Sequence, residues 1–149
     1  MKRNPWYPLA LLLVTTLASG NLLAERTRDL GRFVVHYTAM PTDALDAHVA
    51  STYDIETAAG AGMLNVAVAK KQPGGKTIPV TATITADVSD HLGNINMLSI
   101  REIHDGEAVY YIGEFQIRSR EPLHFHITVS PDGAGPPYVL QFEKQFMLK

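Results

Sequence analysis

Histidines are the residues of this chain whose type and spacing could do chemistry. The sequence holds six His and no Cys. His124 and His126 lie two residues apart in an alternating stretch, so both imidazoles project from one face of a predicted strand. Such a pair can help to bind Zn²⁺ or Cu²⁺, with Glu121 and His36 as conceivable further ligands. Because an alternating strand carries polar residues on its outer face in any case, we predict no metal and no other cofactor.

Nucleophilic catalysis has weaker support in the sequence. Ser89, Asp90 and His91 are adjacent, but a catalytic triad is assembled by geometry in space, and the chain has no G-x-S-x-G motif and no Cys. The glycines at 60–62 and 74–75 lack the Lys-Ser/Thr pair of a phosphate-binding loop. The sequence therefore predicts that the protein is not an enzyme.

The first 24 residues have the pattern of a secretory signal peptide. Lys2 and Arg3 precede an apolar run from Leu9 to Ala18, and small residues follow at Gly20 and Ala24. Cleavage is possible after either small residue, and the run is too short for a membrane span. The pattern predicts export to the periplasm and no stable membrane span after cleavage.

The remaining residues, 25–149, have the length and composition of one globular domain. They contain 11 Lys and Arg against 15 Asp and Glu. No basic run could follow a phosphate backbone, so we expect no nucleic-acid partner.

Alternating apolar residues predict seven strands in this domain, at 32–39, 63–71, 78–88, 99–104, 107–117, 122–129 and 138–148. One short helix, for which Asp43 is the expected N-cap, is inserted between the first two strands. Short strands separated by turn residues are typical of a seven-stranded antiparallel β-sandwich, immunoglobulin-like in architecture, and a small barrel is the alternative fold.

The segment from Ser99 to Ile117 is predicted to be a hairpin with a type I′ turn at Asp105-Gly106. This register pairs His104 with Glu107. Alternation then assigns one face of the hairpin to the core. The predicted core residues on that face are Leu98, Ile100, Val109, Tyr111, Gly113, Phe115 and Ile117.

The opposite face of the hairpin is mixed, too apolar for full solvation and too charged for a dry core. Such an apolar strip on a soluble protein usually marks a contact. Either the inserted helix covers it with Leu45, Val49 and Tyr53, or a partner or second copy does; we favour the helix because its apolar side needs a place to pack. The residues in question are Met97, Arg101, Ile103, Tyr110, Ile112 and Glu114.

Five segments of the chain resemble a known family of exported bacterial proteins, domain of unknown function 4426. The matching segments are Gly31–Tyr37, Leu64–Val66, Arg101–Ile103 with Tyr110–Phe115, and Pro137-Tyr138. The resemblance implies a periplasmic β-sandwich with no established activity, and it supplies no catalytic or ligand-binding residues.

The sequence thus predicts a non-catalytic binding or accessory module that acts through a protein partner in the periplasm. The alternative is a metal-binding protein or small hydrolase that uses His124 and His126. The sequence does not indicate the identity of the partner or the oligomeric state.

Overall fold

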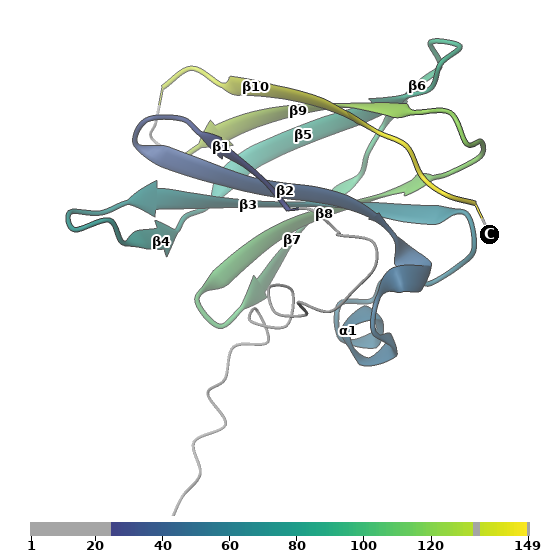
Figure 1. Ribbon diagram of the computed structural model, residues 1–149. Coiled ribbons are helices and arrows are strands. Elements are labelled where there is room, and N and C mark those ends of the chain that lie inside the picture. Colours follow the sequence, from purple (N-terminus) through teal and green to yellow (C-terminus); the bar gives the residue numbers. More distant parts are fainter. Residues whose placement is uncertain (1–24, 133–134, 149) are drawn as a thin grey trace, which may run out of the picture.

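The computed structural model describes residues 25–132 and 135–148, and the predicted signal peptide lies outside them. Within these ranges the chain is mostly β, with one short α-helix and one 3₁₀ turn (Figure 1). No helix of the described part is long and apolar enough to cross a membrane. The strands are β1 (Arg26–Asp29), β2 (Phe33–Pro41), β3 (Ala61–Lys71), β4 (Thr77–Pro79), β5 (Ala82–Ser89), β6 (Ile95–Met97), β7 (Ile100–Asp105), β8 (Ala108–Gln116), β9 (Leu123–Pro131) and β10 (Tyr138–Lys144).

The strands form two antiparallel sheets, which pack face to face (Figure 1). The first sheet has the order β1-β2-β3-β8-β7, with β4 paired to β3, and the second has the order β10-β9-β5-β6. Every pairing between neighbouring strands is antiparallel. Each sheet therefore has one inner face toward the other sheet and one outer face.

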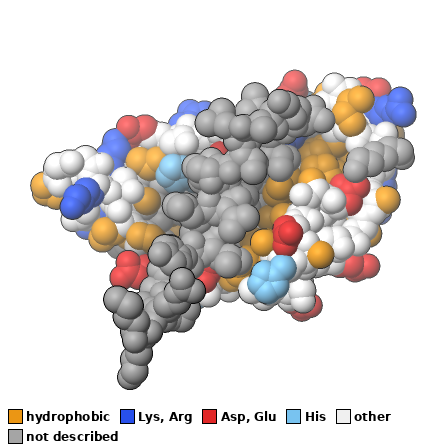
Figure 2. Space-filling view, turned by 60° about the horizontal axis from the view of Figure 1, so that its bottom comes forward, with side chains coloured by type: hydrophobic (Ala, Val, Ile, Leu, Met, Phe, Trp, Pro, Cys, Tyr) orange, Lys and Arg blue, Asp and Glu red, His pale blue; other side chains and the backbone are white. Residues whose placement is uncertain are grey.

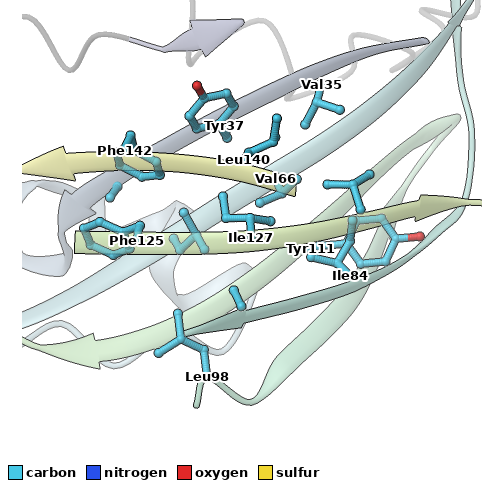
Figure 3. Packing of buried hydrophobic residues seen from close by; sticks show 14 of the residues in the cluster. Val35, Tyr37, Val66, Ile84, Leu98, Tyr111, Phe125, Ile127, Leu140 and Phe142 are labelled. Atoms are coloured by element: carbon cyan, nitrogen blue, oxygen red, sulfur yellow. The ribbon is translucent and has the colours of Figure 1, made fainter. Parts of the chain in front are cut away.

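Alternate residues of both sheets fill the space between them (Figure 3). Within this cluster the ring of Phe125 stacks on Phe142, with centroids 4.7 Å apart, and Phe115 meets Phe125 edge-on at 5.0 Å. These are the arrangements that aromatic quadrupoles favour. The hairpin residues predicted for the core, from Leu98 to Ile117, lie in or against this cluster, with the glycine among them also buried.

The prediction of seven strands is wrong in number, because β1, β4 and β6 add three short strands. The predicted strand 78–88 is divided between the sheets. Val80 N–H still donates to Val68 of the first sheet, whereas the carbonyl of Thr81 accepts from Asp132, the residue that follows β9 of the second sheet. The alternation runs unbroken through this crossing because inward residues stay inward on either sheet.

The first predicted strand begins at residue 32, yet Arg26–Asp29 already form β1 at the edge of the first sheet. All four residues are exposed, so no apolar pattern marks the strand. Backbone pairing to β2 and the guanidinium of Arg26, 5.0 Å from the Phe142 ring centroid, hold it in place.

The register predicted for the β7–β8 hairpin is wrong. Asp105 pairs with Ala108, so the turn is centred on Gly106-Glu107, and His104 faces Val109 rather than Glu107. Of the two residues at the centre of this turn, only Gly106 has positive φ, as a type II′ turn requires. The observed turn lies one residue later than the predicted one, so the strand register differs by two residues. A shift of two leaves every side chain of the hairpin on its predicted face.

The inserted helix, α1 (Ala47–Thr52), follows a 3₁₀ turn at Thr42–Ala44 that contains Asp43. The N-cap is Asp46, not Asp43, and its carboxylate accepts from the backbone N–H of His48 at 2.8 Å and of Val49 at 3.3 Å. Such caps stabilise a helix by about 1 kcal/mol. Six residues are still too few for a stable isolated helix, so α1 depends on packing.

Candidate functional site

The mixed face of β7 and β8 is covered from within the chain. Ile112 is 4% exposed and belongs to a second buried cluster on the outer side of the first sheet. This confirms the internal cover, although Ala50 and Ile55 are the buried residues contributed by the helical segment and Val49 is only half-buried. The cluster consists of Met40, Ala50, Ile55, Met63 and Ile112, with Leu45, Tyr53, Ile103 and Tyr110 packed against it.

Arg101 fastens the end of α1 to β7. Its Nη1 and Nη2 atoms donate to the carbonyls of Tyr53 and Asp54, each at 3.1 Å. The Tyr53 hydroxyl donates to Asp105 at 2.8 Å, and burial together with this carboxylate raises the pKa of Tyr53 to about 12. The register of the hairpin places Arg101 opposite Ile112.

Two predicted members of this face are not buried under the helical segment. Glu114 is exposed, and Met97 belongs to β6 in the second sheet, where it is 70% exposed. Figure 2 views the molecule from the side of β7 and α1. Hydrophobic side chains lie in the middle of the view, and Lys and Arg lie toward its two ends. The covered face is therefore a structural element of the first sheet, and Met97 is part of a different surface.

Met97 and the histidine pair lie on the same outer face of the second sheet, with β5 between them. Strand pairing aligns two rows of residues across β6, β5, β9 and β10. The first row is Ile95, Ser89, His124 and Glu143, and the second is Met97, Asp87, His126 and Gln141.

Carboxylates on opposite sides hold the two imidazoles of this face. His126 Nδ1 lies 3.1 Å from Asp87 Oδ2 on β5, whereas His124 Nδ1 lies 3.6 Å from Glu143 Oε2 on β10. The rings are thus drawn toward different strands. Across residues 25–132 and 135–148, no three His, Cys, Asp or Glu side chains are placed to hold a metal ion. His36, a conceivable ligand, lies on β2 of the other sheet and pairs with Glu25 at 2.6 Å.

The β5–β6 hairpin, residues 82–97, exposes three large apolar side chains. Leu92 is 74% exposed, Ile95 66% and Met97 70%. Ile95 and Met97 lie on β6 beside the histidine rows, and Leu92 lies in the connecting loop. We name these three residues the apolar edge.

Asp90 organises the loop that carries Leu92. Its Oδ1 accepts from the N–H groups of Leu92 and Asn94 at 2.9 Å, and its Oδ2 from the Asn94 side chain at 2.8 Å. The bonds from Asn94 are the main reason why the pKa of Asp90 is lowered. The carboxylate is thus occupied with the loop rather than with His91 or Ser89, and Leu92 is presented on an ordered turn.

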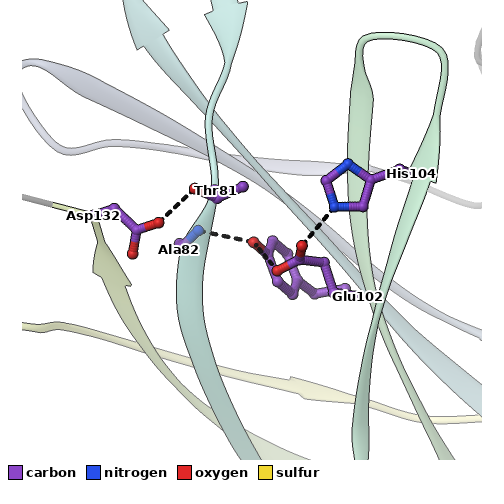
Figure 4. Close-up of polar contacts among 6 residues, drawn as sticks. Thr81, Ala82, Glu102, His104 and Asp132 are labelled. Carbon is purple, nitrogen blue, oxygen red and sulfur yellow. Dashed lines mark hydrogen bonds and ion pairs between the residues drawn. The ribbon is translucent and has the colours of Figure 1, made fainter.

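A chain of polar contacts joins the two sheets near the start of β5 (Figure 4). The buried Tyr111 hydroxyl accepts from Ala82 N–H at 2.8 Å and donates to Glu102 at 3.0 Å, and Glu102 contacts His104 Nε2 at 2.5 Å. Nearby, the Thr81 hydroxyl donates to Asp132. Burial is the main reason that the pKa of Tyr111 rises to about 12, whereas contact with His104 lowers that of Glu102. These contacts join the start of β5 to the first sheet.

Sequence reasoning missed the apolar edge and this polar chain. The sequence predicts no strand between residues 88 and 99, and Met97 was assigned to the mixed face of the β7–β8 hairpin rather than to β6. The available signal was an isolated Leu and Ile on either side of Gly93-Asn94, an unusual composition for a solvent loop.

Two packed antiparallel sheets with a helix inserted between β2 and β3 define a mostly β two-layer protein. A family model described as "Domain of unknown function (DUF4426)" matches residues 27–148. The chain belongs to this family, which confirms the resemblance. Comparison with curated proteins gives no match.

Solved structures show the same fold. A crystal structure of a DUF4426 family protein from Pseudomonas aeruginosa is similar with 27% identity and a TM-score of 0.72, over 87% of this chain and 99% of that one. FetP of uropathogenic Escherichia coli, expressed recombinantly in the periplasm, is similar with 9% identity and a TM-score of 0.58, over 85% and 95% of the two chains. A copper-bound FetP variant gives 8% identity and 0.57, over 83% and 95%.

Proposed function

We propose that the protein is a non-catalytic binding or accessory module of the periplasm, which acts through a protein partner that docks on the apolar edge. The observation that carries the proposal is the exposure of Leu92, Ile95 and Met97 together on one hairpin. Single exposed apolar residues are ordinary, but a contiguous group marks an interaction surface.

The ordered loop adds to this argument. Binding immobilises side chains and loops at a cost in entropy, and the Asp90 hydrogen bonds meet much of that cost before a partner arrives. Leu92 then acts as a preorganised anchor, with Ile95 and Met97 extending the contact along β6.

Site-specific crosslinking tests the proposal. A photoreactive amino acid at position 92 should capture one defined partner in living cells, whereas the same group at the exposed Thr83 of β5 should not. Replacing Ile95 and Met97 with Ser should abolish the capture without changing the melting temperature. Equal capture from both positions, or capture that survives the double substitution, contradicts the proposal.

An immunoglobulin-like β-sandwich is our proposal for the architecture. The seven longest strands follow one another as β2, β3, β5, β7, β8, β9 and β10. Their order in the sheets is first-second-fifth-fourth and seventh-sixth-third. That order supports the comparison, because immunoglobulin constant domains arrange their strands in the same way.

Export is the second part of the proposal. The basic start and apolar run of the chain support it, as does the fold shared with FetP, which was expressed in a periplasm. Mass spectrometry of protein from periplasmic extract should find Asn21 or Glu25 at the N-terminus. An intact Met1 in the membrane fraction contradicts export.

Metal binding at the outer face of the second sheet, as a metal-binding protein or a small hydrolase, is the second candidate. A carboxylate near Nδ1 of each of His124 and His126 leaves Nε2 for a metal, the arrangement of many histidine ligands. The fold is also that of FetP, a variant of which was solved with copper. Stoichiometric submicromolar Cu²⁺ binding that is lost in the double variant His124→Ala, His126→Ala but kept in His36→Ala supports this candidate; its absence removes it.

A further inference from the structure

Five strands lie at sheet edges in the described part of the chain, and four of them carry the usual protection. β1 and β7 are rich in charged residues, β4 ends in Pro79, and β10 carries Glu143 and Lys144, with Arg26 donating to the carbonyl of Glu143 at 3.2 Å. Charges and proline at an edge prevent pairing with other chains. β6, with the sequence Ile-Asn-Met, has neither.

The backbone of β6 is also oriented for pairing. Leu98 N–H donates to Ala86 at 2.9 Å, and Asp90 N–H donates to Asn94 at 3.1 Å. Hydrogen-bonded positions alternate along an antiparallel pair, so Asn94, Asn96 and Leu98 face β5. The N–H and C=O groups of Ile95 and Met97 therefore point to the open edge, because β6 is the last strand of its sheet.

From these two features we propose that an extended segment of the partner protein adds to β6 as a further strand of the second sheet. Its backbone bonds to Ile95 and Met97, and its apolar side chains pack on the same two residues and Leu92. Strand addition combines main-chain bonds with alternate side-chain contacts in this way. The inference rests on the proposed function, for which it specifies the mode of docking.

Charge indicates the chemistry of the segment. Residues 82–98 contain Asp87 and Asp90 but no Lys or Arg. A segment that alternates apolar with basic residues complements this edge, and like charges would oppose an acidic one.

A second copy of the chain is a poorer occupant. Self-pairing would bring the same aspartates together and would join only three residues on each side, far from the roughly 1,200 Å² of a stable interface.

The test uses the exported protein purified from the periplasm, with a synthetic twelve-residue peptide of alternating Val and Lys as the probe. Binding should slow hydrogen exchange at the amides of Ile95 and Met97 and should weaken when Glu replaces Lys in the peptide. Met97→Pro removes the outward N–H and leaves the pairing to β5 intact. We expect this variant to bind the peptide about fivefold to tenfold more weakly, the worth of one backbone hydrogen bond.

Each other outcome overturns the inference. Unchanged binding by Met97→Pro, protection at other amides, preference for the Glu peptide, or no binding excludes addition of a basic strand. Concentration-dependent protection without peptide shows that the occupant is a second copy. Failure of strand addition can be distinguished from failure of the proposed function. If Met97→Ser abolishes crosslinking from position 92 but Met97→Pro does not, the partner docks on the apolar edge through side chains alone.

Discussion

The outer faces of the two sheets carry similar apolar residues, but these residues are buried on the first sheet and exposed on the second. On the first sheet, Met63 and Ile112 are each 4% exposed because α1 and the residues after it cover them. On the second sheet, Ile95 and Met97 lie at an edge that no element of the described chain covers.

The difference shows that residue type alone does not assign a role to an outward apolar residue. The chain between β2 and β3 is long enough to fold back over its own sheet, and Arg101 fixes it there. The short loop before β6 cannot fold back in this way, since Asp90 holds it in a turn. Apolar residues of the first face therefore contribute to stability, whereas those of the second are available for binding.

The largest expected effect is that of Ile112→Glu. Burial of an isoleucine is worth about 1.5–3 kcal/mol, and an unpaired buried carboxylate adds a further penalty. We expect a strongly lowered melting temperature in thermal unfolding, with no loss of an oligomer in light scattering. Ile95→Glu is the matched control on the open face and should leave the melting temperature unchanged. Equal effects of the two substitutions would remove the distinction between the faces.

Tyr111→Phe should have the next largest effect. The substitution leaves Ala82 N–H without its acceptor inside the protein, at a cost of about 1–3 kcal/mol. Denaturant unfolding measures this loss. Tyr110→Phe, one residue earlier and under the helix, is the control and should cost less. If the control costs as much, the contact between the sheets is not what Tyr111 contributes.

Arg101→Met should loosen the cover without unfolding the protein. The substitution keeps most of the apolar stem and removes the bonds to the carbonyls of Tyr53 and Asp54, which is worth about 1 kcal/mol at a half-exposed site. Hydrogen exchange should accelerate in residues 47–55 more than in β9. Uniform acceleration would mean that the helical segment and the sheets open together.

Much of the fold follows from local patterns in the sequence. The alternation in 107–117 and 122–129 determines which residues face inward. This part of the prediction is correct although the hairpin turn was misplaced, because a register shift of two residues leaves each side chain on the same face. The strands β1 and β6 were not predictable in this way. They pair through backbone groups at sheet edges, and their side chains are exposed whatever their type.

The candidate site was less accessible to sequence reasoning than the fold. His124 and His126 were correctly placed on one outward face, but their carboxylate partners come from other strands. Asp87 of β5 lies 39 residues before His126, and Glu143 of β10 lies 19 residues after His124, so only the sheet order joins them. Met97 was assigned to the helix-covered face, because nothing local marks the point at which the chain leaves one sheet for the other. The apolar edge appears only when that crossing at Leu98 is known.

The smallest expected effect is a pH dependence at the exposed end of the polar chain. The contact with His104, and then that with Tyr111, holds the pKa of Glu102 below its ordinary value of 4.5. A carboxyl whose pKa is lower in the folded state stabilises the fold above its ordinary pKa, and this contribution disappears as the pH falls through the lowered folded value. The difference in melting temperature between the wild type and Glu102→Gln should therefore be larger at about pH 5 than at about pH 3. Glu107→Gln, at the turn of the same hairpin, controls for the loss of one carboxylate. A difference that stays the same down to about pH 3 would show that Glu102 contributes through its shape and not through its charge, and that the polar chain ends at Tyr111.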